Sequence, residues 1–350
     1  MDDKKVLREL SEISGVSGAE KEIGDRVKEL FNHYVQDVRK DTLGNIIGYK
    51  PGSKNGKIKI MLAAHMDEIG LMITDIEEGF LRFTTVGGVD KRTLVGQEVL
   101  IEGRDKTYSG IIGAKPSHIQ DKKEKKQSYN LDELYIDPGL PAEEVEEKFQ
   151  IGGFITINRE SSALEGERMA GKAFDDRAGL LVILETLEEL TKLRHDADVY
   201  PVATVQEEVG VRGAFTSTYG IVPEIGIAID VTHAQIPGLS EEETAKLGEG
   251  PVLALGPQIH PSLFAKLKSV AEEFNINYQI QPSPRPGGTD AYAIQITRGG
   301  ISTALLSIPL RYMHTSVETI DLSDIKTTSR LLARVIADLE ADFKEELLCF

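Results

Sequence analysis

Val199-Tyr-Pro-Val-Ala-Thr-Val-Gln-Glu-Glu208 begins as a mostly apolar run and ends in two adjacent carboxylates. A short run of this kind is typical of a buried strand in a parallel sheet. Open α/β sheets carry their chemistry at the carboxyl ends of such strands. The stretch therefore predicts an α/β domain with a functional site beside Glu207 and Glu208.

Four other residues of metal-binding type lie at the boundaries of predicted elements. His65 and Asp230 close apolar runs, and Asp175 and His314 lie in turns next to such elements. Zinc-like ions take imidazole nitrogen and carboxylate oxygen, and two ions about 3.5–4 Å apart need a bridging carboxylate. Two imidazoles and three carboxylates meet this need and predict a two-metal hydrolase. The predicted metal ligands are His65, Asp175, Glu208, Asp230 and His314.

Two further carboxylates are predicted to assist without binding metal. Water bound to such ions has a pKa near 7, and Glu207 could accept its proton and pass it to a leaving amine. Asp67 follows His65 by two residues, so its carboxylate could accept the other imidazole N–H and fix the tautomer. Each pattern is common alone, and only their joint occurrence at element boundaries favours a catalytic site.

The order of predicted elements indicates one domain inserted into another. Residues 68–163 hold short strand-like pieces and glycine-rich turns without a long helix, which is typical of a small β-rich module. Strands and helices alternate on both sides of this segment. We therefore predict that residues 1–67 and 164–350 form one α/β domain and that residues 68–163 form an inserted β-rich domain.

Within the α/β part, apolar periodicity predicts individual helices and strands. Ser17-Gly-Ala-Glu20 has the form of a capping box that opens the second helix. The predicted helices are 4–13, 19–31, 178–190, 261–274 and 322–343, and the predicted strands are 44–48, 57–64, 199–205, 225–229, 278–281 and 303–307.

Composition limits the partners and the compartment. The 350 residues include 57 acidic and 40 basic side chains, and the net charge of −17 argues against nucleic acid or an anionic membrane as partner. The basic run at 122–126 is interrupted by Glu124 and is interpreted as a solvated loop. No apolar stretch approaches 18 residues, no signal peptide is visible, and Cys349 is the only cysteine. These features predict a cytoplasmic protein without disulfides.

Seven segments, spread nearly end to end, carry a family resemblance. They are Ser14-Gly-Val-Ser-Gly18, Asp41-Thr-Leu-Gly-Asn45, Ala64-His-Met-Asp-Glu-Ile-Gly70, Lys172-Ala-Phe-Asp-Asp-Arg177, Gln206-Glu-Glu-Val-Gly210, Gly287-Gly-Thr-Asp-Ala291 and Pro309-Leu-Arg-Tyr-Met-His-Thr315. In this combination the chain resembles the M42 metallo-aminopeptidases, which include glutamyl, deblocking and tetrahedral aminopeptidases.

The resemblance implies a zinc-peptidase-like mixed sheet flanked by helices, with the inserted domain serving dimerisation. It implies two divalent metal ions, zinc or cobalt, one held by His65 and Asp230 and the other by Glu208 and His314. Asp175 would bridge them, with a cis peptide bond after it. Glu207 would be the general base, and Asp67 would orient His65.

The resemblance also implies short peptides as substrates, and dimers that assemble into a hollow tetrahedral dodecamer. Similar segments in relatives place Asp290 near the substrate, where both a direct and a supporting role are open. The preferred N-terminal residue of the substrate is not predicted.

Two other enzyme classes are alternatives. A deacylase would use the same ligands. A glycanase is suggested because some similar proteins are labelled endoglucanases. However, adjacent residues of one strand point to opposite sides, so Glu207 and Glu208 would flank one glycosidic bond poorly. The chain also lacks tryptophan, a frequent platform for sugars.

Overall fold

The computed structural model describes residues 1–53, 58–120, 128–285, 287–340 and 342–348. The predicted basic loop at 122–126 and Cys349 lie outside these residues. In the described part, none of the helices has the length and apolar character needed to cross a bilayer.

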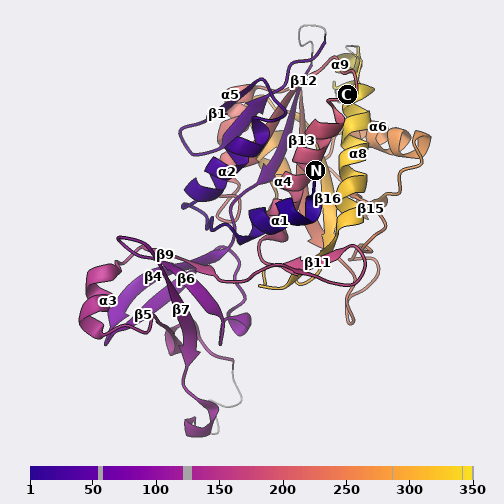
Figure 1. Cartoon of the computed structure of the whole chain (residues 1–350). Coiled ribbons are helices and arrows are strands. Elements are labelled where there is room, and N and C mark those ends of the chain that lie inside the picture. The colour runs from indigo at the N-terminus through magenta and orange to yellow at the C-terminus, as the bar shows by residue number, and fades with distance from the viewer. Residues whose placement is uncertain (54–57, 121–127, 286, 341, 349–350) are drawn as a thin grey trace.

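A mixed eight-stranded sheet forms the centre of the larger domain (Figure 1). Its four middle strands are parallel. Antiparallel pairs add two outer strands on one side and one on the other, where a last strand then pairs in parallel at the edge. In spatial order the strands are β1 (Asp37–Lys40), β2 (Ile46–Tyr49), β12 (Asp198–Thr204), β3 (Lys59–His65), β13 (Ile225–His233), β16 (Ser302–Leu310), β14 (Val252–Leu255) and β15 (Gln279–Pro282). This confirms the predicted mixed sheet.

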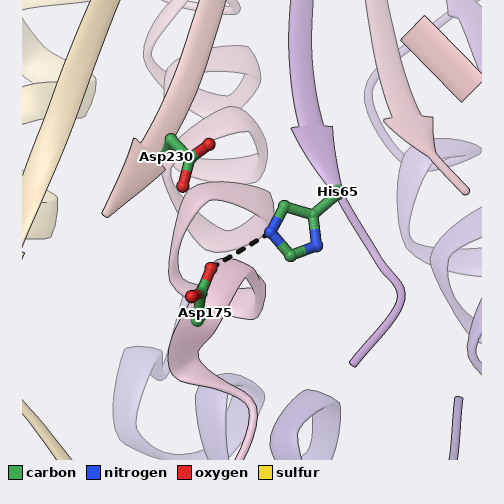
Figure 2. Close-up of side chains that lie close together, drawn as sticks. All are labelled: His65, Asp175 and Asp230. Carbon is green, nitrogen blue, oxygen red and sulfur yellow. Dashed lines mark hydrogen bonds and ion pairs between the residues drawn. The ribbon is translucent and has the colours of Figure 1, made fainter. Parts of the chain in front are cut away.

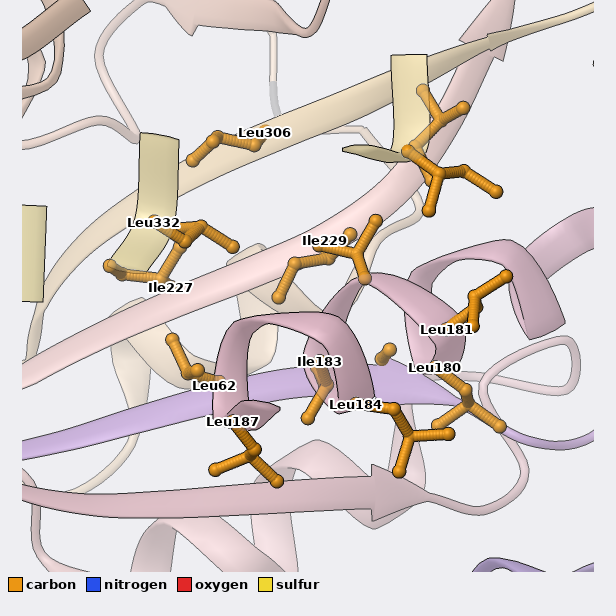
Figure 3. Close-up of a cluster of buried hydrophobic side chains, with 14 of the residues drawn as sticks. Leu62, Leu180, Leu181, Ile183, Leu184, Leu187, Ile227, Ile229, Leu306 and Leu332 are labelled. Carbon is orange, nitrogen blue, oxygen red and sulfur yellow. The ribbon is translucent and has the colours of Figure 1, made fainter. Parts of the chain in front are cut away.

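Helices cover both faces of the sheet. Alternation along β3 places Ile60 and Leu62 in a core with α4 (Phe174–Glu189) and α8 (Leu322–Ala337). Met61 and Ala63 lie in a second core with α5 (Arg212–Ile221) and α7 (Asp290–Ile296). Helix α4 is buried on nearly all sides, as expected for a helix that is apolar around its whole circumference (Figure 3). The helices of this domain are α1 (Asp3–Glu12), α2 (Lys21–Phe31), α4 (Phe174–Glu189), α5 (Arg212–Ile221), α6 (Pro261–Glu273), α7 (Asp290–Ile296), α8 (Leu322–Ala337) and α9 (Phe343–Glu346).

The inserted segment forms a closed six-stranded barrel at one end of the α/β domain (Figure 1). It has its own apolar core, which includes Leu71, Val99 and Ile136. Its strands are β4 (Gly70–Glu77), β5 (Phe80–Val86), β8 (Leu134–Asp137), β7 (Thr107–Ala114), β6 (Glu98–Glu102) and β9 (Phe154–Ile157), and the short helix α3 (Ala142–Lys148) is added to them. All of these lie within the predicted segment 68–163.

A small three-stranded sheet lies where the chain returns from the barrel. It consists of β10 (Ser162–Ala163), β11 (Arg168–Gly171) and β17 (Glu318–Asp321). Strand β17 follows the loop that carries His314, and β11 precedes the turn that carries Asp175. The sheet therefore brings two predicted ligands together although they are far apart in the sequence.

Three local predictions are wrong. Ser17 and Glu20 form no capping box, because the hydroxyl of Ser17 donates to Asp67 and the carboxylate of Glu20 accepts from Gly18 N and Gln206 N. The final long helix ends at Ala337 rather than at residue 343. Strand β12 ends at Thr204, close to the predicted 205, so Glu207 and Glu208 lie in the loop after it and not on one strand, as the argument against a glycanase assumed.

Candidate active site

His65, Asp175 and Asp230 come together from three different elements (Figure 2). His65 is the last residue of β3, Asp230 lies in β13, and Asp175 lies in the first turn of α4. His65 Nε2 is 3.1 Å from Asp175 Oδ1, and one potential ligand atom of each residue lies within 4.8 Å of the others. All three are buried. We call them the first ligand group.

Asp175 also belongs to a second ligand group, with Glu208 and His314. His314 Nε2 lies 3.3 Å from Asp175 Oδ2 and 3.3 Å from Glu208 Oε1. The two oxygens of Asp175 thus face two different histidines. This is the arrangement that a carboxylate between two cations requires.

The turn around Asp175 separates it from the neighbouring aspartate. The peptide bond between Asp175 and Asp176 is cis, as the resemblance implied. Asp176 Oδ1 accepts from Gly179 N at 3.0 Å, so this side chain caps the start of the continuous part of α4. Asp175 is the one of the two that joins both ligand groups.

Like charges converge in these groups with little solvent to screen them. Burial, together with the charge of Asp175, raises the pKa of Asp230 to about 8. Burial and the charges of Asp230 and Asp290 raise the pKa of Glu207 to about 10 against the opposing effect of His65. Divalent cations would offset this repulsion, and imidazole and carboxylate are ligands that zinc accepts. The residues present therefore fit a metal site.

The loop that carries Glu207 and Glu208 is held by side chains from the N-terminal part of the chain. Four consecutive main-chain N–H groups each donate to a side-chain oxygen: Val205 N to Asn45 Oδ1 at 3.0 Å, Gln206 N to Glu20 Oε1 at 3.2 Å, Glu207 N to Asp67 Oδ1 at 3.0 Å and Glu208 N to Asp67 Oδ2 at 3.2 Å. The segments around residues 20, 45 and 67 thereby fix an irregular loop beside the ligand groups.

The predicted hydrogen bond between the imidazole of His65 and the carboxylate of Asp67 is not formed, because the main-chain carbonyl of Asp67 takes that place. His65 Nδ1 lies 3.1 Å from the carbonyl oxygen of Asp67 and 3.7 Å from its Oδ1. The carboxylate, which is fully buried, instead accepts from Ser17 Oγ and from the two glutamate N–H groups. Asp67 therefore links the histidine to the loop of Glu207 and Glu208.

Glu318 is a supporting residue that sequence reasoning missed. Its Oε1 accepts from His314 N at 2.8 Å, and its Oε2 accepts from Asp175 N at 3.1 Å. His314 has a φ of 61°, in the left-handed region, so its backbone needs such an anchor. Glu318 is 2% exposed, and burial raises its pKa to about 8. In the sequence, the only indication of this supporting role was that Glu318 follows His314 by four residues.

Asp290 lies beside the first ligand group at the start of α7. Its Oδ2 accepts from Thr204 Oγ1 at 2.5 Å, and its Oδ1 has no hydrogen-bond partner among the described residues. Burial raises its pKa to about 6. Because Asp290 is only 2% exposed, its position favours the supporting role over direct contact with a substrate.

Fold and site together define a class, the α/β metallohydrolases. Residues 44–331 match the M42 glutamyl aminopeptidase family, and this chain belongs to that family of metal-dependent aminopeptidases, which hydrolyse peptide bonds. The lysyl aminopeptidase of Pyrococcus furiosus is 39% identical over 345 residues, which are 97% of this chain and 98% of the relative.

Solved structures agree with this membership. An aminopeptidase of Desulfurococcus kamchatkensis superposes with a TM-score of 0.92 at 40% identity and covers 99% of this chain and 97% of its own. The TET1 peptidase of Pyrococcus horikoshii, described as assembling into a tetrahedron or a large octahedral shell, has a TM-score of 0.86 at 32% identity, with 97% and 100% coverage. The family favours an aminopeptidase over the deacylase and glycanase alternatives.

Proposed function

We propose that each chain holds two divalent cations, zinc or cobalt, and trims N-terminal residues from short peptides. One cation would be held by His65 and Asp230, the other by Glu208 and His314, and Asp175 would bridge them. The observation that carries this proposal is the orientation of Asp175, whose two oxygens face His65 and His314 at 3.1 and 3.3 Å.

In this proposal Glu207 is the general base. Two such cations, when bound, lower the pKa of water and polarise the scissile carbonyl. Glu207 accepts the proton of the attacking water and returns it to the departing amine. Its side chain is 8% exposed and so is shielded from bulk water, and its N–H bond to Asp67 fixes its main chain.

Substrate and assembly rest on the relatives and on the shape of the molecule. A cavity between the barrel and the α/β domain reaches the second ligand group. Leu71, Val89, Leu94 and Ile157 form an apolar part of its wall, and the ion pair of Glu68 and Lys172 lies in another part. The apolar part could receive an uncharged part of a peptide. We propose that the barrel mediates dimerisation and that dimers assemble into a closed dodecamer, as the dodecamer and the shells described for TET1 suggest.

The proposal is tested with aminoacyl-p-nitroanilides of Leu, Glu, Asp, Lys and Ala. The purified chain is assayed after exhaustive chelation and again after addition of Zn²⁺ or Co²⁺. We expect activity to disappear with chelation and to return with metal for one group of substrates. Activity that survives complete removal of metal would contradict the proposal. It would also be contradicted if protein that binds metal hydrolysed none of the substrates.

A further inference from the structure

We propose that Glu20 is a positioning residue for Glu207, which it reaches through the main chain of Gln206. This inference rests on the proposed role of Glu207 as general base. Glu20 immediately precedes α2, remote in sequence from the ligand groups, and is 7% exposed. A buried carboxylate needs a reason to be retained, because burial without hydrogen bonds is costly.

The contacts of Glu20 point to that reason. Its Oε1 accepts from two main-chain groups, Gly18 N at 2.8 Å and Gln206 N at 3.2 Å. Gln206 has a φ of 55°, so a non-glycine residue occupies the left-handed region immediately before Glu207. Such a conformation persists only where the surroundings hold it. The acceptor oxygen of Glu20 supplies that hold, because it binds the N–H of the left-handed residue itself.

The location of the hydrogen bond from Gln206 N to Glu20 determines which part of the loop its loss would affect. Gln206 N has no other acceptor among the described residues, whereas the N–H groups of Val205, Glu207 and Glu208 are bound by Asn45 and Asp67. Removing Glu20 would therefore free one anchor and leave three. The loop would remain folded and Glu208 would keep its place. Gln206 O would still accept from Arg212 N at 3.2 Å, but the left-handed backbone at Gln206 would lose the bond to its N–H and would be held less firmly next to Glu207.

A base that is misplaced by a fraction of an ångström slows proton transfer without weakening substrate binding. Small errors of position at reacting groups cost up to about 100-fold in rate. We therefore expect Glu20→Ala to lower kcat by about 10- to 100-fold and to leave KM nearly unchanged. Both cations should remain bound, because none of their proposed ligands contacts Glu20.

Substitutions at the same position separate the hydrogen bond from the charge. Glu20→Gln keeps an acceptor oxygen at the same reach and should restore most of the activity. Glu20→Asp keeps the charge but is one methylene shorter, so it should resemble Glu20→Ala. Glu22→Ala, an exposed glutamate two residues along the chain, is the matched control and should behave as wild type.

The experiment measures kcat and KM on the most active p-nitroanilide of the panel, with zinc content and unfolding temperature for each variant. A kcat loss in Glu20→Ala and Glu20→Asp, with rescue in Glu20→Gln and full zinc content, supports the inference. Unchanged kcat in Glu20→Ala, loss of zinc, or rescue by Asp rather than Gln overturns it. Glu207→Gln is assayed alongside: if that variant stays active, the proposed base itself is wrong, whatever Glu20 does.

Discussion

At the scale of single residues, the buried acids around the site mostly bind main-chain N–H groups. Asp67 spans Glu207 N and Glu208 N, and Glu318 spans Asp175 N and His314 N. A carboxylate has two acceptor oxygens, so one side chain can fix two segments of chain at once. Sequence alone could not reveal these roles, because the donors are backbone groups that any residue could supply.

Glu318→Gln is expected to weaken metal binding by the second ligand group. An amide has only one acceptor oxygen, so either Asp175 N or His314 N would face an NH₂ group. Loss of such an outer contact typically costs about 10- to 100-fold in metal affinity. Calorimetric titration of chelated protein with Zn²⁺ would measure this. Glu165→Gln, at an exposed position, is the control. An unchanged affinity in Glu318→Gln would contradict the assigned role.

At the scale of elements, long apolar runs allowed prediction and short irregular ones did not. Strands β3, β12, β13 and β16 and helix α4 were predicted, because each contributes an uninterrupted buried stretch. The four-residue strands β8 and β14 were missed, although β15, which is equally short, was predicted. Helices α5 and α7 were missed since one contains two glycines and the other spans only seven residues.

In the candidate site, too, some features could be predicted from the sequence and others could not. The ligand residues could be proposed because His, Asp and Glu at the ends of apolar runs are a recognisable chemical pattern. The sharing of Asp175 between two groups depends on β11 pairing with β17, a long-range contact without a periodic signal. The hydrogen bonds from the loop to Glu20 and Asn45 likewise join segments that are far apart in the sequence, so they depend on tertiary structure.

The pairing of α4 with α8 predicts a pH-dependent stability. Glu185 on α4 accepts from Ser329 Oγ on α8 at 2.7 Å, and its other oxygen has no partner among the described residues. Burial and the charge of Asp3 raise its pKa to about 7, although Ser329 and Lys326 oppose the shift. As pH rises from about 4.5 to 7, the unfolded state loses this proton before the folded state does, so stability falls.

Glu185→Gln cannot titrate and should escape that fall. We expect its free energy of unfolding to exceed that of wild type by about 1–3 kcal/mol at pH 8, with little of this gain at pH 5. Urea unfolding at pH 5, 6, 7 and 8 would measure the difference. A gain that is equal at all four values, or that is larger at pH 5, would contradict the assignment.

At the scale of the whole molecule, the barrel stands apart from the α/β domain and has a closed core of its own (Figure 1). Its strands begin only a few residues after Asp67, so it also forms one wall of the cavity next to the second ligand group. A domain in this position could join subunits while leaving the ligand groups reachable. The short strand-like pieces and glycine-rich turns of residues 68–163 predicted an inserted β-rich domain. They did not predict that its strands close into a barrel.

The proposed assembly has a simple test. One chain has a mass of 38.4 kDa, so a dimer and a dodecamer are separated widely by size. Light scattering on the eluting peak of a gel-filtration column should give the mass of at least two chains. The largest mass that we expect is that of twelve chains. Because the charge of −17 makes copies repel each other, the larger assembly should be favoured at moderate rather than low salt. A single-chain mass at all protein and salt concentrations would contradict the proposal.

We propose that two cations, shared through Asp175, act with Glu207 on one peptide bond. This proposal is tested most directly by adding zinc stepwise to chelated protein and recording bound zinc per chain beside the rate of p-nitroanilide hydrolysis. We predict that the rate reaches its plateau at two ions per chain and that Glu207→Gln binds the same two ions without turning over substrate. A full rate at one ion per chain, or a Glu207→Gln variant that loses an ion or keeps its activity, would contradict it.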